Sequence, residues 1–504
     1  MLFITFRFVS CFLLYFHKIC GIISLVMKKM KKIIVSLKNK STTNNGVFQG
    51  WGSSLCWWAH RIGYSPVLTK KSAEIFYSDN GLNLNIMRYN IGGGDDPTHK
   101  HITRTDSEVP GWLYFDNKSN TYSYKYDADS NQLNVLKECY KASGDDAYVE
   151  VFSNSPPYFM TKSGCSSGGK NPTRDNLRED SYEAFAEYLA HVTEYINNKL
   201  NIKVSSISPM NEPASSYWHY LSDKQEGCHF SSGKSQNKII FETAKAIRAK
   251  GLKDVEIVAS DETSTSHQIT SYNKYTDEVK EIIDRISTHT YITRRSKQLG
   301  QLAKEKGFNL WMSETDWSNT LGKSSGEMGA GLWLASKIIT DINDLSPSAW
   351  IIWLVIDFHI SKNGFNGNKD FGMPDMSKGF WGVAVADHDN EEIILSQKYY
   401  AFGQFSRYIR PGDSIIHCDK NTLASFNNAS KKLTIVTFNS SEKDIEKDFI
   451  LDGFDIAFSE YKTIRTSGSL KDGEHWKDLG KTSLENNTFK TKIKGYSITT
   501  YVIE

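Results

Sequence analysis

Short apolar runs alternate with longer amphipathic stretches between about residues 50 and 400. The stretch 182–200, for example, carries apolar side chains at helical spacing, which predicts a helix lying on a hydrophobic core. Such alternation is typical of parallel strands joined by crossover helices, and eight repeats predict an α/β fold, the (β/α)8 TIM barrel. The predicted strands are 52–56, 83–89, 147–153, 204–209, 255–260, 285–290, 308–313 and 349–356.

The pattern changes after Arg410, Pro411 and Gly412. Short segments of alternating polar and apolar residues follow to the last residue, separated by polar turns, which is typical of an antiparallel β-sandwich. A strand-like run, 33–37, precedes the barrel, and we expect it to pair with the C-terminal sheet. The sequence therefore predicts two domains. They are a catalytic barrel, 47–405, and an accessory antiparallel β-sandwich built from 31–46 and 406–504.

The N-terminal extension, residues 1–30, is apolar but interrupted by basic residues, and its strongest basic run, KKMKK, comes last. A secretory signal has its basic residues before the apolar stretch. Three interpretations stay open: a membrane anchor, an atypical signal, or a translation start at Met27 or Met30. The third makes the protein cytoplasmic, and the others make it secreted or anchored through 1–26. We expect no stable membrane insertion of the catalytic part, whose apolar runs are shorter than the roughly 18 residues that a span needs.

The charge balance argues against a polyanionic partner. Lys and Arg number 60 against 58 Asp and Glu, a formal net charge of +2. A chain so nearly neutral offers no field for nucleic acid. Aromatic residues make up 12% of the chain, and flat rings with a polar tip suit the faces of sugar rings, although core packing explains most of them. A neutral partner such as a carbohydrate is therefore favoured.

Seven cysteines occur at irregular spacing, which forms neither a CxxC metal motif nor a dense disulfide framework. We expect most of them to be buried free thiols. A disulfide between Cys165 and Cys228 stays open, because both lie in glycine-containing loops that should follow neighbouring barrel strands.

A glutamate stands at the end of each of two predicted barrel strands. Glu212 ends the apolar run in ISPMNEP, and Glu314 ends the run in LWMSETDW. Catalytic residues of TIM barrels lie at the carboxyl ends of the strands. Two carboxyl groups about 5–5.5 Å apart can cleave a glycosidic bond with retention of configuration, one as the acid and the other as the nucleophile. An ordinary salt bridge is the alternative for either residue, but two such glutamates on the fourth and seventh strands favour catalysis.

Several motifs together resemble one known family. They are QGWGSSLCWW, MRYNIGG, NSPPYFMTKSG, SPMNEP, THTY, WMSE and QKYYAFGQFSRYIRPG. In this order and spacing they resemble glycoside hydrolase family 30, and more specifically its endo-β-1,6-galactanase-like branch, from about residue 47 to the C-terminus. The resemblance implies a retaining hydrolase on a (β/α)8 barrel with a side β-sandwich, without metal and without cofactor.

The resemblance also implies roles for residues that match the family's motifs. Glu212 corresponds to the acid/base and Glu314 to the nucleophile. Asn211 is expected to bind the sugar 2-hydroxyl. Arg88 is expected to lie beneath Glu314 and keep it ionised, since a neighbouring cation lowers a carboxyl pKa; a purely structural ion pair would have nearly the same geometry.

Further residues are expected to bind the substrate. His289 and Tyr291 alternate along a strand and so face the barrel axis. The family's pattern places them at the scissile sugar, although His289 could instead be a core histidine. Trp353 matches a platform under the sugar ring, and Tyr158 occupies a position where relatives often carry another aromatic residue. Loop residues behind strand ends are expected to contact neighbouring sugars: Trp57, Trp58, Trp218, Trp317, Trp381, Glu226 and His229.

Two local clusters resemble ligand sites. His99 and His101 in THKH alternate as metal ligands can, but no third ligand is suggested, and surface histidines are the simpler interpretation. The glycines at 92–94 precede Asp95 and Asp96 but lack the Lys-Ser/Thr of a phosphate-binding P-loop. We interpret this segment as a turn that brings one of the aspartates to a sugar hydroxyl, and we expect no metal.

The sequence thus predicts a retaining β-glycoside hydrolase that cleaves β-1,6-linked galactan or galacto-oligosaccharides through a covalent glycosyl-enzyme. Its partner would be a β-linked oligo- or polysaccharide, and we expect a monomer. A glucosylceramidase-like or β-glucosidase activity is the nearest alternative. A non-catalytic carbohydrate-binding barrel is a third hypothesis, disfavoured because both glutamates are present.

Overall fold

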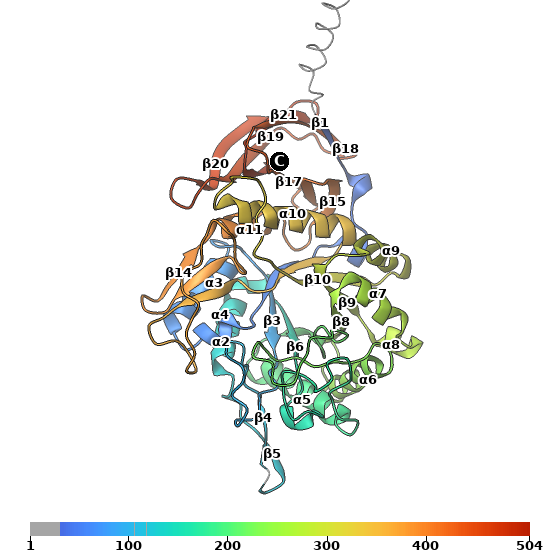
Figure 1. Cartoon of the computed structure of the whole chain (residues 1–504). Coiled ribbons are helices and arrows are strands. Elements are labelled where there is room, and N and C mark those ends of the chain that lie inside the picture. Colours follow the sequence, from blue (N-terminus) through green and yellow to red (C-terminus); the bar gives the residue numbers. More distant parts are fainter. Residues whose placement is uncertain (1–30, 105, 117) are drawn as a thin grey trace, which may run out of the picture.

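The computed structural model describes residues 31–104, 106–116 and 118–504, so the predicted N-terminal extension lies outside the described residues. Eight parallel strands close into a barrel, in the order β2-β3-β6-β7-β8-β9-β10-β11. The predicted (β/α)8 barrel is confirmed, and Figure 1 shows it below the C-terminal sheets. The barrel strands are β2 (Gly50–Ser54), β3 (Ile86–Asn90), β6 (Tyr148–Phe152), β7 (Val204–Ser208), β8 (Glu256–Ser264), β9 (Arg285–Ile292), β10 (Asn309–Thr315) and β11 (Ala349–Ile352).

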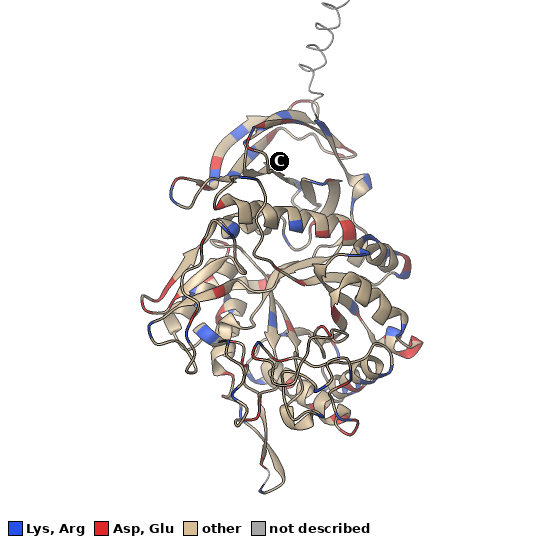
Figure 2. Cartoon of the chain, viewed as in Figure 1, with Lys and Arg blue, Asp and Glu red and all other residues tan. Residues whose placement is uncertain are grey.

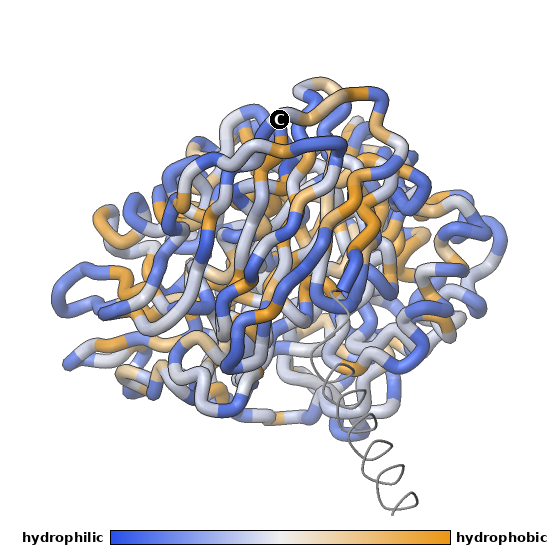
Figure 3. Tube along the Cα trace, turned by 90° about the horizontal axis from the view of Figure 1, so that it is seen from above, coloured by the Kyte–Doolittle hydropathy of each residue, from blue (hydrophilic) through white to orange (hydrophobic). Residues whose placement is uncertain are grey.

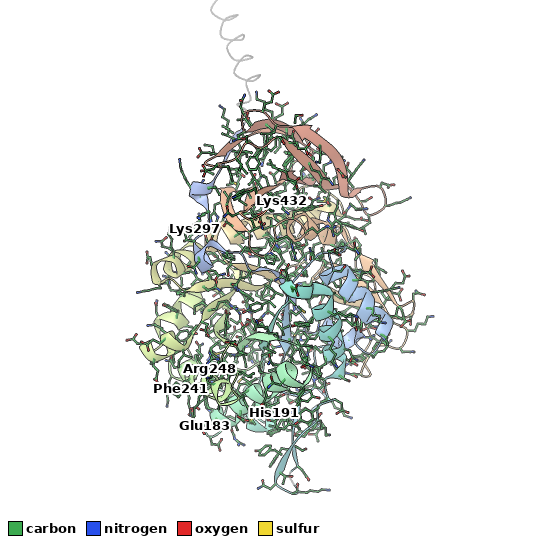
Figure 4. All side chains as sticks on the ribbon, turned by 180° about the vertical axis from the view of Figure 1, so that it is seen from behind. Glu183, His191, Phe241, Arg248, Lys297 and Lys432 are labelled. Atoms are coloured by element: carbon green, nitrogen blue, oxygen red, sulfur yellow. The ribbon has the colours of Figure 1, made fainter. Side chains whose placement is uncertain are left out.

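Helices surround this barrel and carry their apolar faces toward it. In α5 the predicted stripe is buried, including Phe185 and Leu189. Figure 4 labels Glu183 of α5 and Phe241 and Arg248 of α6, three exposed side chains of two helices that pack side by side. The helices are α2 (Trp58–Ile62), α3 (Pro66–Tyr77), α4 (Ser130–Ser143), α5 (Tyr182–Glu194), α6 (Lys234–Ala249), α7 (Thr265–Asn273), α8 (Asp277–Ile282), α9 (Ser296–Lys306), α10 (Met328–Leu345) and α11 (Gln397–Ser406).

The ends of the first and last barrel strands differ from the prediction. The first strand ends at Ser54, because the chain turns directly into helix α2 instead of continuing to residue 56. The last strand ends at Ile352, and the apolar residues after it begin a separate small sheet. That sheet contains β12 (Ile356–Ile360), β13 (Ala384–Asp387) and β14 (Glu392–Leu395), and a hairpin of β4 (Leu113–Asp116) and β5 (Thr121–Tyr124) follows β3.

The C-terminal region forms two sheets around a second apolar core. A six-stranded sheet has the order β15-β16-β17-β22-β19-β20, and a three-stranded sheet has the order β1-β18-β21. Figure 3 shows apolar and polar residues alternating along these strands. The strands are β1 (Lys31–Ser36), β15 (Ser414–Asp419), β16 (Thr422–Asn427), β17 (Lys432–Asn439), β18 (Ile445–Asp452), β19 (Glu460–Ser467), β20 (Glu474–Ser483), β21 (Thr488–Ile493) and β22 (Ser497–Ile503).

The N-terminal strand pairs with the C-terminal sheet, as expected, but in parallel. Ile33 of β1 lies opposite Phe449 of β18, and both side chains are buried in the second core. No hairpin joins these two strands, so chain connectivity does not force them to be antiparallel. Because β1 completes this sheet, we propose that 31–46 and 406–504 form the accessory domain beside a barrel domain of 47–405.

Two further features bear on partners. Figure 2 shows basic and acidic residues interspersed over the helices and loops, in keeping with the near-zero net charge. Within 31–104, 106–116 and 118–504, no helix is both long and apolar enough to cross a membrane.

The disulfide that the sequence left open is not formed, since Cys165 and Cys228 are buried free thiols.

Candidate active site

The carboxyl ends of β7 and β10 bring the two predicted glutamates together. Glu314 is the next-to-last residue of strand β10, and Glu212 lies four residues beyond the end of β7. Glu212 has a positive φ of 47°, and its amide donates a hydrogen bond of 2.8 Å to the carbonyl of Asp261 in β8. Such a backbone conformation is costly for a non-glycine residue and persists only where its surroundings hold it. The neighbouring strand therefore holds Glu212 in place at the barrel mouth.

A histidine lies between the two carboxyl groups. His289 Nδ1 is 3.1 Å from Glu212 Oε1 and 3.5 Å from Glu314 Oε1. One carboxylate oxygen of each glutamate and one ring nitrogen of His289 lie within 4.8 Å of one another. The hydroxyl of Tyr291 donates to Glu314 Oε1 at 2.9 Å. The two carboxyl groups therefore face each other across the mouth of the barrel.

A buried layer of charge supports Glu314 from below. Arg88 is fully buried, and its guanidinium contacts three carboxylates: Glu314 at 3.1 Å, Glu150 at 2.9 Å and Asp261 at 3.0 Å. Glu150 is also paired with Arg285. Burial opposes the charge of Arg88, but these three anions raise its pKa well above the usual value. The guanidinium is therefore a permanent cation that fixes the position of Glu314.

The charges at the barrel mouth favour a proton shared by the triad. Burial raises the pKa of Glu212, but the hydrogen bond and charge of His289 lower it to a net decrease. Burial also raises the pKa of Glu314, and despite His289 and Arg88 it stays raised. For His289 burial lowers the pKa, and the surrounding carboxylates, Glu314 first, raise it overall. The free site thus favours the extra proton on the imidazole, whereas the sequence argument placed it on Glu212.

Glu212 and Glu314 line a cavity of about 520 Å³. Aromatic rings form much of its wall. Tyr291 and Trp317 each lie against Trp381, with ring centroids 5.8 and 5.7 Å away, and Trp353 meets Trp57 edge to face at 5.2 Å. The cavity is lined by Trp57, Arg104, Asn211, Glu212, Tyr217, Trp218, Ser222, Lys224, Gln225, Thr263, Tyr291, Ile292, Glu314, Trp317, Trp353, Asp357 and Trp381.

Asn211 has an unused acceptor in this cavity. Its side-chain oxygen is buried and has no hydrogen-bond partner among the described residues. A buried polar atom without a partner is costly and calls for a ligand or water. The oxygen is therefore available to a hydroxyl group of a bound sugar.

The profile of a family described as O-Glycosyl hydrolase family 30 matches residues 31–365, which is more than half of the chain. The chain belongs to this family. It is therefore a glycoside hydrolase, and the cavity between Glu212 and Glu314 is the candidate active site of a family 30 enzyme.

Several named proteins are similar to this chain over most of its length. An endo-beta-1,6-galactanase of Hypocrea rufa is 29% identical over 92% of this chain and 93% of its own length. An exo-beta-1,6-galactobiohydrolase of Bifidobacterium longum is 26% identical over 80% of this chain but only 34% of its own length. A glucuronoxylanase XynC of Bacillus subtilis is 22% identical over 87% of this chain and 94% of its own length.

Solved structures share the fold of this family 30 enzyme. A conserved exported protein of Bacteroides fragilis superposes with a TM-score of 0.72 at 19% identity, covering 94% of this chain and 100% of that one. The catalytic domain of a GH30 xylanase C from Talaromyces cellulolyticus gives a TM-score of 0.68 at 18% identity, with the same coverage. At these identities the likeness concerns the fold alone.

Most of the predicted site residues meet at this one place in the family 30 enzyme. Arg88 and His289 lie under the cavity, and a larger set lines it. Thr290, between His289 and Tyr291, points outward and donates to Asp341 of α10 at 2.9 Å, as the strand alternation predicted. The predicted residues that line the cavity are Asn211, Glu212, Tyr291, Glu314, Trp57, Trp218, Trp317, Trp353 and Trp381.

Two predicted aromatic contacts lie elsewhere. Trp58 is fully buried in helix α2, where its indole N–H donates to the Ser54 carbonyl at 2.8 Å and its ring packs against Phe76. Helix α2 begins at Trp58, so consecutive tryptophans diverge and only Trp57 reaches the cavity. Tyr158 packs edge to face against Phe159 and does not line the cavity.

Two residues predicted to make polar contacts with sugar are also buried in the loops and do not line the cavity. The carboxylate of Glu226 accepts hydrogen bonds from the side chain of Asn90 at 3.1 Å and the amide of Gly93 at 2.8 Å. Burial raises the pKa of Glu226 to about 8. His229 donates from Nδ1 to the carbonyl of Ser215 at 2.9 Å. Both side chains satisfy loop backbone or side-chain groups, which loop position in the sequence could not indicate.

Other residues of the site were missed. The hydroxyls of Tyr217 and Thr263 both donate to the carboxylate of Glu212. Asp261 follows the strand-like run IVAS, so it carried the same strand-end signal as the two glutamates. Tyr217 and Thr263 carried no such signal. At the rim, Arg104 pairs with Asp357, and its guanidinium stacks on Trp57 at 4.4 Å.

Proposed function

We propose that this enzyme is a retaining β-glycosidase in which Glu314 is the nucleophile and Glu212 the acid/base. Glu314 attacks the anomeric carbon while Glu212 protonates the leaving oxygen, which gives a covalent glycosyl-enzyme. Water then attacks that intermediate, with Glu212 now taking the proton. The observation that carries this proposal is the placement of both carboxylates within 4.8 Å around His289, with Arg88 bound only to Glu314 of the two.

The proton for the first step comes from His289 in this proposal. Its Nδ1 is within 3.1 Å of Glu212 Oε1, so the proton needs to move only along one hydrogen bond. A bound sugar excludes water from the carboxyl group of Glu212, and desolvation favours its neutral form. Substrate binding therefore drives the proton from the imidazole to the carboxylate that must act as the acid.

The substrate that we propose is β-1,6-linked galactan or its oligosaccharides. The support is that the Hypocrea rufa endo-beta-1,6-galactanase matches nearly the whole of both chains. The Bifidobacterium longum relative is also named for a β-1,6-galactose linkage. Asn211 would bind a sugar hydroxyl, and the rings of Trp353, Trp317 and Trp381 would provide flat apolar faces for successive sugar units.

Product analysis on a panel of glycans tests the substrate. The panel contains a β-1,6-galactan, β-1,6-galacto-oligosaccharides, glucuronoxylan and an aryl β-glucoside. We expect galactose-containing products from the first two. Cleavage of the aryl β-glucoside alone would support the glucosidase-type alternative, and cleavage of glucuronoxylan alone would support a xylanase. Proton NMR of the first product tests the mechanism: the β-anomer appears first if configuration is retained.

A further inference from the structure

Four side chains with metal-binding atoms meet in a cluster separate from the catalytic triad. Asp95, His99 and His101 come from the loop after β3, and Cys165 comes from the loop after β6. One ligand atom of each lies within 4.8 Å of the others. The sequence interpretation of His99 and His101 as plain surface histidines rested on the lack of a third ligand. The fold supplies a third and a fourth.

Two of the distances between these atoms are close to those around a tetrahedral metal ion, and a third, between Asp95 Oδ2 and His101 Nε2, is shorter at 2.6 Å. His99 Nδ1 lies 3.2 Å from Asp95 Oδ2, and Cys165 Sγ lies 3.5 Å from His101 Nε2. Zinc bonds of about 2.0–2.1 Å to nitrogen and about 2.3 Å to sulfur place tetrahedral ligand atoms about 3.3–3.8 Å apart. A small adjustment of side chains would bring all four atoms to bonding distance of one ion.

The hydrogen bonds of His101 leave a lone pair in the cluster. Its Nδ1 is 2.5 Å from the carbonyl of Ser222, so this nitrogen carries the proton and donates it. In the neutral ring Nε2 is then an acceptor, and it faces Asp95 Oδ2 at 2.6 Å. Two acceptors repel at this distance unless a proton or a cation lies between them. Metal-bound histidines commonly donate their second ring nitrogen to a backbone carbonyl in this manner.

The other ligands are also held in position. Asp95 Oδ1 accepts from the amide of Ser166 at 3.0 Å, which leaves Oδ2 for the cluster. Cys165 is fully buried, and its amide donates to the hydroxyl oxygens of Thr161 and Ser163. Side-chain exposure is 6% for Asp95, 9% for His101 and 17% for His99. Solvent therefore reaches the cluster from the side of His99.

We propose that Asp95 Oδ2, His99 Nδ1, His101 Nε2 and Cys165 Sγ bind one Zn²⁺ ion. Thiolate and imidazole ligands favour zinc over magnesium or calcium. Four protein ligands leave no open position, which is the pattern of a structural and not a catalytic zinc. The thiol of Cys165 loses its proton to solvent when the ion binds.

The ion would tie together three loops at the rim of the active site. The ligands come from the loops after β3 and β6, and the carbonyl that orients His101 belongs to Ser222 of the loop after β7. Ser222 lines the catalytic cavity, and its amide donates to Ser167 Oγ at 3.1 Å. Loss of zinc should therefore raise KM for an oligosaccharide more than it lowers kcat.

Metal analysis of the full-length protein tests the proposal. Protein dialysed against a chelator is titrated with ZnCl₂, and bound metal is measured by mass spectrometry together with the melting temperature. We expect one zinc per chain and a higher melting temperature. With Co²⁺ in place of zinc, the thiolate should give a charge-transfer absorption band that Cys165→Ser abolishes. Cys228→Ser, another buried free thiol, is the matched control and should keep the band.

Histidine variants separate a ligand set from a general effect on folding. His99→Ala changes the most exposed ligand and should weaken zinc binding by more than the roughly 10- to 100-fold of an outer-shell change. His219→Ala, an exposed histidine nearby in the β7 loop, should leave affinity unchanged. The proposal is overturned if the wild type binds no zinc, or if His99→Ala and Cys165→Ser bind it as the wild type does. Loss of zinc in Glu314→Gln with retention in Cys165→Ser would place the ion at the catalytic triad and would also overturn it.

Discussion

The floor and the rim of the active-site cavity are built in different ways. The floor consists of strand-borne, fully buried charges, with Arg88 joined to Glu150, Asp261 and Glu314. The rim consists of loop-borne aromatic residues such as Trp317, which is 44% exposed. Charges in a low dielectric interact strongly and must be paired, whereas each exposed ring contributes a modest stacking energy. We propose that the floor sets the reaction and that the rim sets which sugar chain is held.

After the loss of Glu314, the proposed nucleophile, the largest effect is expected from the loss of Glu212, the proposed acid. Glu212→Ala should lower kcat/KM for a natural glycan by about 10²–10⁴-fold, the usual contribution of a general acid. An aryl glycoside whose leaving group needs no proton should be affected much less in the first step. Steady-state kinetics on both substrates measures the difference. Glu179→Ala, a solvent-exposed glutamate, is the control, and equal losses on both substrates would contradict the role of Glu212.

Removing the floor's central cation should affect the fold itself. Arg88→Met leaves Glu314 and Asp261 without this cation, while Glu150 keeps Arg285, and breaking a buried ion pair costs about 3–5 kcal/mol. Urea unfolding measures the free energy. The matched variant Arg178→Met removes an exposed pair with Asp180, whose loss should cost far less, because water screens it. If both variants lost a similar amount of unfolding free energy, the proposed difference between buried and exposed charges would be contradicted.

The shared proton predicts the alkaline side of the pH profile. The pKa of His289 is raised by its carboxylate neighbours against the effect of burial. The enzyme should therefore keep its acid proton through pH 6.5, the usual value for histidine, and lose activity as pH rises through the raised pKa. The ion pairs of His289 likewise stabilise the fold below pH 6.5, and this contribution disappears over the same rise. His289→Gln should move the alkaline limb of kcat/KM; an unchanged limb would exclude His289 as the proton source.

The rim should give the smallest effect. Trp317→Ala removes one ring of the aromatic wall, and a stacking energy of about 0.5–1.5 kcal/mol corresponds to a roughly 2- to 10-fold rise in KM. Turnover number should change little, because the carboxylates are untouched. Kinetics on a short and a long oligosaccharide separate the two quantities. Tyr122→Ala, an exposed aromatic in β5 away from the cavity, is the control. A large fall in kcat for Trp317→Ala would show that rim and floor are not separate.

The same contrast explains what could be predicted from the sequence. Glu212 and Glu314 were found because strand ends of a barrel must converge, so position in the repeat pattern fixes position in space. The roles of Arg88 and His289 came from the resemblance to family 30. Trp57 and Trp58 could not be told apart, because the start of a short helix decides which ring faces the cavity. Glu226 and His229 are also in loops, where local hydrogen bonds decide the direction of a side chain.

Contacts between loops that lie far apart in the sequence could not be predicted either. Cys165 joins Asp95 and the two histidines only because the β3 and β6 loops are adjacent on the closed barrel. The order of the eight barrel strands was correct because a repeated strand-helix unit has one simple way to close.

Trapping the covalent intermediate tests the central claim, the attack by Glu314, most directly. The enzyme is incubated with a 2-deoxy-2-fluoro glycosyl donor of the sugar that it cleaves, digested and sequenced by mass spectrometry. We predict a single added glycosyl group on the carboxylate of Glu314, and no addition in Glu314→Ala. That variant should regain turnover with azide and release a glycosyl azide of inverted configuration. A label on another carboxylate such as Asp261, or a first product of inverted configuration from the wild type, would contradict the account.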